Sequence, residues 1–274
     1  IYGGPSAAMA SDHTLLFDSR AATRDFPGID RYIRELLAAL LPDLRPDERL
    51  HVILPEAMEI PCLDHTGVTI HRVDADLTTF RSHWQTLRLA RSIRPQVIHA
   101  PYLLTPLRVP GKLVLTVHDT IPLSHPQYSS LATRLFWRLA GRRALRHCRK
   151  LIGVSDDALK TCARFFGTRA VRRSVVIRHG VSPAFRPQPK EAVEAVRRTY
   201  SLPERFLLYV GSDRPHKNVT TLLHALALMD PTASMPLALA GFDSDDSPLR
   251  READELELGQ RVLWLGRIPE VDLP

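Results

Sequence analysis

A short polar loop stands between a strand predicted at 206–210 and a helix predicted at 219–229. It offers backbone N–H groups, a helix amino terminus and a point positive charge, which together suit a bound phosphate. The Gly-x-x-x-x-Gly-Lys-Ser/Thr spacing of a P-loop is missing, so the residues leave open a phosphate site or a plain polar turn. The residues that we predict for phosphate binding are Gly211, Ser212, Arg214 and Lys217.

Two further segments have residues suited to ligand contact. His118 follows an apolar run at 112–117, and ligands of open α/β sheets bind beyond the carboxyl ends of the strands. A structural histidine is the alternative, and Asp119 has an equally simple role as a cap of the next turn. Within segment 25–32, Gly28 permits close approach of a ligand to the backbone, although a plain Pro-Gly turn explains it as well.

The elements that position these residues alternate along the chain. Short β-branched or leucine-rich runs alternate with longer segments of helical periodicity. This alternation is typical of a parallel sheet covered by helices. Strands are predicted at 14–18, 50–54, 68–73, 96–99, 112–117, 150–154 and 174–178. Helices are predicted at 29–41, 81–94, 130–147 and 156–166.

A proline-rich stretch at 182–189 interrupts this alternation and is typical of a linker. After a helix predicted at 190–200, a shorter β-α-β-α-β alternation follows, and a doubly wound domain normally has more strands. Its elements are predicted as strands 206–210, 237–240 and 261–265 and helices 219–229 and 248–258. We therefore predict an α/β protein. Its expected parts are a flexible leader at 1–13, a complete Rossmann-like domain at 14–187 and a partial one at 188–274.

Positive charge is concentrated before residue 243, within a formal net charge of +7. The densest run, 134–150, contains arginines and apolar residues at helical spacing. Its members are Arg134, Arg138, Arg142, Arg143, Arg146, Arg149, Lys150, Leu135, Phe136, Leu139 and Leu145. A solvated helix face is one interpretation, and a patch facing anionic lipid head groups or a phosphorylated substrate is the other. Nucleic acid is disfavoured because interleaved stacking aromatics are missing.

Composition narrows the class of protein. The 44% hydrophobic and 24% charged content is ordinary for a globular protein, and no apolar run is long enough for a membrane span. Three cysteines without metal-like spacing suggest a reducing compartment, so we expect a cytoplasmic protein, at most peripheral at the inner face of the membrane. The twelve histidines show no His-Glu-x-x-His spacing, and no metal is expected. A Gly-x-Gly-x-x-Gly fingerprint is missing, which counts against a nicotinamide enzyme.

Taken together and in order, these segments resemble the retaining glycosyltransferases of family 4, also called group 1. The resemblance covers nearly the whole chain from Leu15 onward. The matching segments are 16–20 with 28–32, 118–119, 152–155, 179–182 with Phe185 and Pro187, 208–211 with 215–219, and 239–241 with 265–266. The resemblance implies a GT-B fold, in which two Rossmann-like domains bind the acceptor on the N-terminal side and a nucleotide-sugar on the C-terminal side.

The resemblance also implies roles. His118 would hydrogen-bond the transferred sugar near the anomeric centre, and Lys217 would neutralise the departing diphosphate. The backbone at Gly28 would approach the donor phosphate or the acceptor, with Arg31 and Tyr32 on the acceptor side. The implied reaction moves a sugar to a glycan or lipid-linked acceptor, with no cofactor, no metal and no separate general base. The loop resembles the mannosyltransferase-like branch, so GDP-mannose is preferred over a UDP-sugar.

Several positions depart from the family pattern. Asp30 stands where glycine is usual and would crowd or repel a phosphate, and Ser182 stands where aspartate is common. Ser212 replaces a frequent arginine, which leaves Arg214 or His216 as substitutes. The last residues, 267–274, resemble the stretch before the family's two-glutamate motif, which holds the donor sugar and ribose. We therefore expect this polypeptide alone to bind nucleotide-sugar poorly and to turn over little. The alternative function is an inactive fragment that binds an acceptor or an anionic membrane surface.

Overall fold

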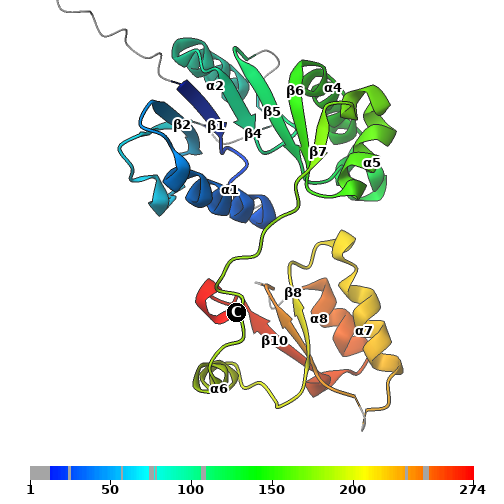
Figure 1. Cartoon of the computed structure of the whole chain (residues 1–274). Coiled ribbons are helices and arrows are strands. Elements are labelled where there is room, and N and C mark those ends of the chain that lie inside the picture. Colours follow the sequence, from blue (N-terminus) through cyan, green and yellow to red (C-terminus); the bar gives the residue numbers. More distant parts are fainter. Residues whose placement is uncertain are drawn as a thin grey trace, which may run out of the picture. The chain divides into compact units, whose positions relative to one another are not determined.

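The computed structural model describes residues 13–23, 26–56, 58–73, 77, 79–105, 109–231, 234–242 and 247–274 (Figure 1). The expected leader, apart from His13, lies outside the described residues, and so does Asp25 of the Pro-Gly segment. The chain packs as two units, of which the first ends at Gly180 and the second begins at Val181. The proline-rich stretch at 182–189 therefore belongs to the second unit, whereas we had expected the first domain to extend to 187.

The first unit is built on one sheet of seven parallel strands, in the order β3-β2-β1-β4-β5-β6-β7. The strands are β1 (His13–Asp18), β2 (Glu48–Pro55), β3 (Val68–Val73), β4 (Val97–Ala100), β5 (Lys112–Val117), β6 (Cys148–Gly153) and β7 (Ser174–Val176). The strand order reverses between β1 and β4, and crevices at such switch points are where ligands of open α/β sheets bind.

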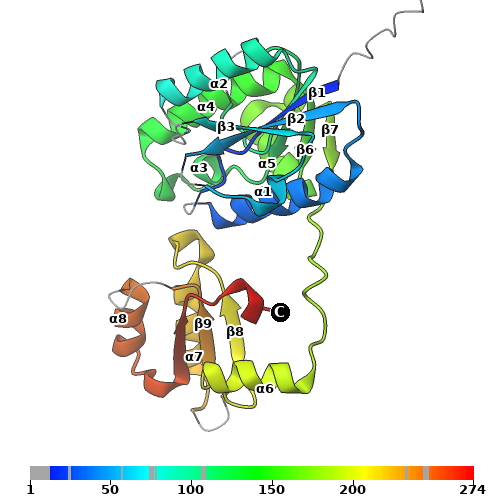
Figure 2. The same ribbon diagram turned by 90° about the vertical axis from the view of Figure 1, so that its left-hand side faces the viewer.

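Helices cover both faces of this sheet. They are α1 (Pro27–Leu40), α2 (Phe80–Ile93), α3 (Ile121–Ser124), α4 (Leu131–His147) and α5 (Asp156–Phe166). Successive strand residues serve opposite faces: Leu16 of β1 belongs to the hydrophobic cluster of α2, α4 and α5, and Phe17 to that of α1. Figure 2 shows α2 and α4 on one side of the sheet and α1 on the other.

Side-chain caps fix where three of these helices begin. Thr79, Ser130 and Ser155 each accept a hydrogen bond from the backbone N–H three residues later, at the start of α2, α4 and α5. Such caps satisfy N–H groups that have no acceptor within the helix.

A buried ion pair follows β1 at the switch point. The guanidinium of Arg20 donates to both carboxylate oxygens of Asp18, at 2.8 and 2.7 Å, and to the hydroxyl of Ser82 on α2 at 2.8 Å. Arg20 is fully buried and Asp18 is 6% exposed. Two charges in such a place require close pairing, because desolvation of either one alone costs several kcal/mol. The pair therefore joins the end of β1 to the start of α2.

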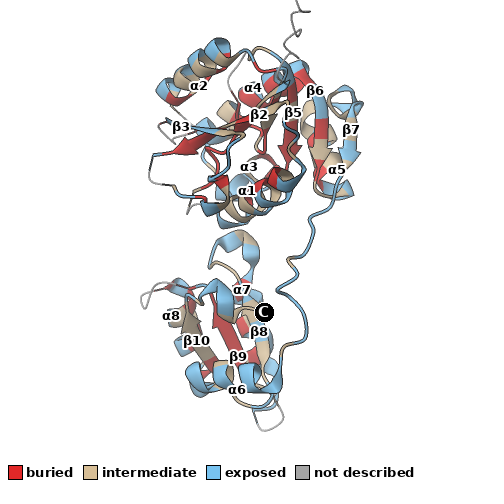
Figure 3. Cartoon of the chain, turned by 60° about the vertical axis from the view of Figure 1, so that its left-hand side comes forward, coloured by how far each residue is buried: buried red, intermediate tan, exposed pale blue. Residues whose placement is uncertain are grey.

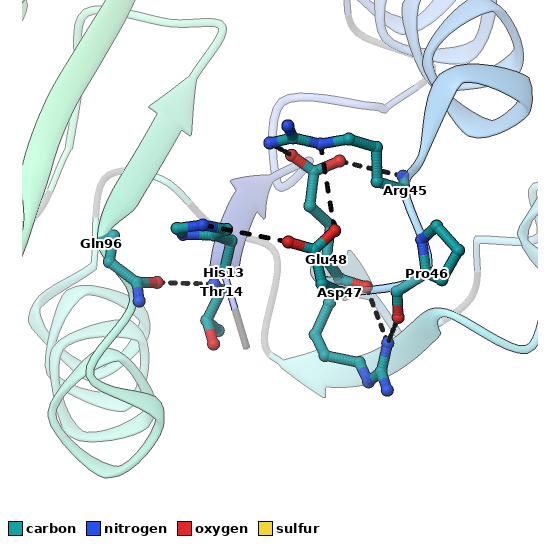
Figure 4. Close-up of polar contacts among 8 residues, drawn as sticks. His13, Thr14, Arg45, Pro46, Asp47, Glu48 and Gln96 are labelled. Atoms are coloured by element: carbon teal, nitrogen blue, oxygen red, sulfur yellow. Dashed lines mark hydrogen bonds and ion pairs between the residues drawn. The ribbon is translucent and has the colours of Figure 1, made fainter. Parts of the chain in front are cut away.

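The amino ends of the strands, opposite the switch-point crevice, have exposed polar contacts (Figure 4). Gln96 and Thr14 exchange two hydrogen bonds that fix the register of β1 against β4, one through the side chain of Gln96 and one through its backbone N–H. Arg45, which is 65% exposed, pairs with the half-buried Glu48 at 2.7 Å. Ion pairs of this kind contribute little to stability.

The second unit has a parallel sheet in the order β10-β9-β8. Its elements are α6 (Lys190–Thr199), β8 (Leu207–Val210), α7 (Val219–Leu228), β9 (Leu237–Ala240), α8 (Pro248–Glu255) and β10 (Val262–Gly266). The four side chains of β9 are buried, as the central strand of a covered sheet requires, and Figure 3 shows this strand within the core.

The elements differ from the sequence-based expectations in a few places. The short helix α3 was not predicted, and α8 ends at Glu255 rather than at 258. The arginine-rich helix ends at His147 as predicted, but the basic run at 134–150 continues past it, so that Arg149 and Lys150 lie in β6. Of the apolar residues of this helix, Leu145 is buried in the core, whereas Leu135 and Leu139 are exposed.

Replacement of Arg20 by methionine tests the importance of the buried pair. It leaves the carboxylate of Asp18 buried without its partner, so the free energy of unfolding should fall by about 3–5 kcal/mol. Urea denaturation followed by circular dichroism measures this change. Arg178→Met, which breaks an exposed pair with Asp156, is the matched control and should leave the midpoint nearly unchanged. Equal effects of the two substitutions would contradict the assignment.

Candidate functional site

His118 lies directly beyond the carboxyl end of β5, next to the strand-order switch point. Its Nε2 lies 3.1 Å from the carbonyl oxygen of Pro101, which follows β4. A carbonyl oxygen only accepts hydrogen bonds, so Nε2 carries the proton. The other ring nitrogen, Nδ1, is then the one that accepts a hydrogen bond in the neutral ring. Asp119 accepts a hydrogen bond from the backbone N–H of Ile121 at 2.9 Å, which is the turn-capping role considered above.

Aromatic rings from two other segments, α1 and the stretch after β7, contact His118. The ring of Tyr32 on α1 meets it edge-on at 4.9 Å between centroids, and the ring of His179 stacks on it at 5.5 Å. Tyr32 and His179 also contact each other, at 5.1 Å. The three rings form a cluster that fixes the orientation of His118.

A chain of hydroxyl and imidazole groups extends from this cluster into the sheet. The hydroxyl of Thr116 on β5 hydrogen-bonds the hydroxyl of Tyr32 at 3.2 Å and Nε2 of His99 at 2.9 Å. Burial raises the pKa of Tyr32, a shift that the bond to Thr116 partly opposes. The phenol is therefore protonated at neutral pH and retains its hydrogen.

Burial also decides the protonation state of the two histidines. Removal from water lowers the pKa of His118 to about 4, with a further contribution from His179, while the Pro101 carbonyl and Asp119 act in the opposite direction. Burial, together with His118, lowers the pKa of His99 to about 4. Both rings are neutral at pH 7. With a conjugate acid this strong, His118 is a weak base, so the ring is suited to hydrogen bonding rather than to proton abstraction.

Gly28 and Arg31 lie in the first turn of α1, which begins with Pro27 and has no side-chain cap at Phe26. A Cβ atom added to Gly28 would meet no atom within 4 Å, so the packing of the protein itself does not require glycine there. Asp30, the unusual residue of this turn, has its carboxylate on Arg34 Nε at 2.9 and 3.1 Å. This pairing partly neutralises the charge that was expected to repel a phosphate.

In the second unit, three loops meet at the carboxyl ends of the strands. The N–H of Gly211 donates to the carbonyl of Ala240 at 3.0 Å, and the N–H of Gly241 donates to that of Gly266 at 2.8 Å. Gly241 has φ of +99°, and a Cβ there would lie 2.2 Å from the Gly211 carbonyl oxygen. Glycine is therefore required at 241, because only glycine allows the loops after β8 and β9 to approach this closely.

The phosphate loop proposed from the sequence lies at this edge. Tyr209 donates from its hydroxyl to the carbonyl of Ser212 at 3.1 Å and so fixes the turn after β8. Lys217 is exposed, and no ion pair engages its ammonium group within the described ranges. Asn218, at φ +55°, precedes α7 without capping it, because its side-chain oxygen accepts from Thr221 instead. The first-turn N–H groups of α7 therefore remain available to an anion.

Of the residues predicted in the first unit, the structure brings Tyr32 against His118, while Gly28 and Arg31 lie in the first turn of α1. Those predicted in the second unit, Gly211, Ser212, Arg214 and Lys217, lie between β8 and α7. Sequence reasoning missed Thr116, His99 and His179 as neighbours of His118. A histidine or threonine inside an apolar strand was the available signal for the first two. For His179 the signal was its place in the matched motif at 179–182.

Comparisons with known proteins identify the family. Residues 27–185 match Glycosyltransferase Family 4, and residues 194–274 match Glycosyl transferases group 1. Together with the fold, these matches show that the chain belongs to glycosyltransferase family 4, group 1.

Similar proteins agree with this assignment. O-antigen chain mannosyltransferase B of Escherichia coli is 26% identical over 190 residues, which are 67% of this chain and 49% of that protein. The chain therefore spans about half the length of this curated relative. The structure of Anabaena HepE in complex with UDP-glucose has a TM-score of 0.68 at 17% identity, with 94% of this chain and 70% of that chain covered. WaaG, a glycosyltransferase involved in lipopolysaccharide biosynthesis, has a TM-score of 0.62 at 16% identity, with 94% and 71% covered. These likenesses define a GT-B fold.

Two negative findings concern the described part of the chain. It contains no group of three or more His, Cys, Asp or Glu side chains arranged to hold a metal ion. None of its helices combines the length and the apolar character that a membrane crossing demands.

The protonation state of His118 gives a prediction. Because its folded pKa of about 4 lies below the ordinary value of 6.5, stability is full above pH 6.5 and declines as the pH falls towards 4. The Cε1–H resonance, assigned by its loss in His118→Gln, should not titrate between pH 7.5 and 5.5 in NMR spectra. A midpoint near 6.5 would show that the ring is not held in its neutral form.

Proposed function

We propose that this protein transfers a sugar from a nucleotide-sugar to a glycan or lipid-linked acceptor, with retention of configuration at the anomeric carbon. One observation supports this proposal most strongly. In each unit of this family member, polar groups lie at the carboxyl ends of the sheet's strands. One edge supplies a neutral histidine among aromatic rings, and the other supplies an open helix amino terminus and a lysine.

The donor diphosphate binds at the loop after β8. The N–H groups of the first turn of α7 donate to the phosphate oxygens, and Ser212 adds a hydroxyl donor. Lys217 neutralises the charge that develops on the leaving diphosphate, so this step requires no divalent cation. Arg214, in the same loop, supplies a second cation near the phosphates. GDP-mannose is the preferred donor, in line with the similarity to a mannosyltransferase, and a UDP-sugar is the alternative, since HepE is known in complex with UDP-glucose.

His118 orients the transferred sugar. Its Nδ1 accepts a hydrogen bond from a sugar hydroxyl, because Nε2 is already engaged with the carbonyl of Pro101. A ring with a pKa of about 4 is a poor base for a hydroxyl group. The departing phosphate therefore takes the proton of the acceptor, which Arg31 and Tyr32 of α1 hold in place.

Substitution of Lys217 tests the donor site. Lys217→Ala removes one charge-assisted hydrogen bond, so the Kd for GDP-mannose should rise by about tenfold or more. Chemical-shift titration by NMR measures the weak binding that we expect of this chain. Lys190→Ala removes an equally exposed lysine from α6 of the same unit and should leave the Kd unchanged. An unaltered Kd in Lys217→Ala would refute the assignment of the phosphate loop.

A second candidate function, contact with an anionic membrane surface on the cytoplasmic side, is favoured by one observation on α4. Three leucines one helical turn apart are exposed, namely Leu131 at 73%, Leu135 at 56% and Leu139 at 59%. Arg138 and Arg142 are exposed on the same helix. A solvated helix face does not require three exposed leucines, whereas a lipid interface favours apolar side chains beside basic ones.

Vesicle sedimentation tests this second function. Leu135→Ser combined with Leu139→Ser should reduce binding to phosphatidylglycerol vesicles by about tenfold, because less apolar area enters the interface. The binding that remains should weaken as salt increases. Leu208→Ser replaces an equally exposed leucine of β8, at 57%, and is the control. Wild-type protein that does not sediment with the vesicles would exclude the membrane contact.

A further inference from the structure

A pocket lined by five arginines lies at the amino-terminal end of the strands in the first unit's sheet. His118 lies at the opposite, carboxyl-terminal end of these strands. The pocket has a volume of about 720 Å³ and lies where β6 begins, whereas the candidate site lies beyond the carboxyl ends of the strands. Its walls come from the last turns of α4, the end of α5 and the segment before β7. The arginines are Arg142, Arg146, Arg169, Arg172 and Arg173. The volume is within the range of about 300–1,000 Å³ that small-molecule sites occupy.

The charge of this arginine pocket is not balanced by the protein. No carboxylate lines the pocket, and no ion pair joins its arginines to acidic side chains of the described residues. The carboxyl ends of α4 and α5 lie here, and each helix end contributes about −0.5 of a charge. Together these ends offset about one positive charge of five. Roughly four remain, and because all five side chains are exposed, water screens their repulsion and their guanidinium groups are accessible to an anion.

The floor of the arginine pocket is apolar. Leu145, Cys148 and Leu151 are buried, and the ring of Phe166 completes the lining. Burial raises the pKa of Cys148 to about 11, so the thiol is neutral and adds no negative charge. The combination of a basic rim and an apolar floor suits a ligand whose charged part has several oxygens and whose remainder can contact hydrocarbon.

We propose that the arginine pocket binds a diphosphate or a clustered phosphate group of a small molecule. Guanidinium groups match phosphate oxygens by paired hydrogen bonds, and several of them converging on one cavity favour a polyanion over a single negative charge. The ligand is either a free phosphate compound or the headgroup of an anionic lipid. In both cases the pocket is separate from the loop after β8 that contains Lys217, here called the donor loop, which lies in the second unit.

Calorimetric titration with inorganic pyrophosphate tests the proposal. Arg142→Gln combined with Arg146→Gln should raise the pocket Kd by about tenfold or more, because two charge-assisted contacts are lost. Arg138→Gln combined with Arg143→Gln removes the same charge from the same helix outside the pocket and should change the Kd by less than about threefold. Equal weakening by both pairs would mean non-specific attraction and would overturn the proposal, as would the absence of binding to the wild-type chain.

The donor loop is a second place where pyrophosphate could bind, so the same titration is run with Lys217→Ala. Binding that persists in Lys217→Ala and is lost in Arg142→Gln/Arg146→Gln supports the arginine pocket, whatever the fate of the donor assignment. Binding that depends on Lys217 alone overturns the pocket and leaves the proposed function intact.

Sedimentation with vesicles that contain cardiolipin, whose headgroup carries two phosphates, then distinguishes the two sources of phosphate. If pyrophosphate competes with the vesicles and the pocket substitutions abolish sedimentation, the ligand is a lipid headgroup. If sedimentation of the pocket variant equals that of the wild type while its pyrophosphate affinity is lost, the ligand is a free phosphate compound.

Discussion

The buried contact of Arg20 with Asp18 and Ser82 is the constraint on which the first unit's site depends. It fixes the chain where it leaves β1, the strand at which the sheet order reverses. The helix α1 follows from this point and carries Tyr32 to the end of β5, where it meets His118. A buried pair of this kind is weak as a source of stability, but its geometry is demanding, so it specifies one path for the chain.

The two groups of site residues are suited to different ligands because their environments differ in burial and charge. Around His118, desolvation by packed rings keeps the imidazole neutral and leaves one nitrogen to accept hydrogen bonds. Around Lys217, an exposed loop presents a charge and unpaired backbone N–H groups to an anion. A sugar with many hydroxyl groups suits the first environment, and a diphosphate suits the second. This division matches what a glycosyltransferase has to bind.

Much of the fold could be predicted from the sequence, because hydrophobic alternation and helix caps are local signals. The strands at 112–117 and 237–240 and the helix at 156–166 agree with the structure at both ends. The stacking of His179 on His118 could not be predicted, since it depends on a contact between segments 61 residues apart. Nor could the arginine pocket, because Arg169, Arg172 and Arg173 join Arg142 and Arg146 only through the packing of α5 against α4.

Backbone amide NMR with added GDP-mannose or UDP-glucose tests whether the loop after β8 binds the donor phosphates. We expect shift changes to gather at the amides of Gly211, Ser212 and Val219, where the phosphates would lie. Binding that saturates only at millimolar nucleotide-sugar would still support the assignment, because the test depends on which amides shift. Changes confined to residues outside 211–221, or none at the highest concentration of either nucleotide-sugar, would contradict the account.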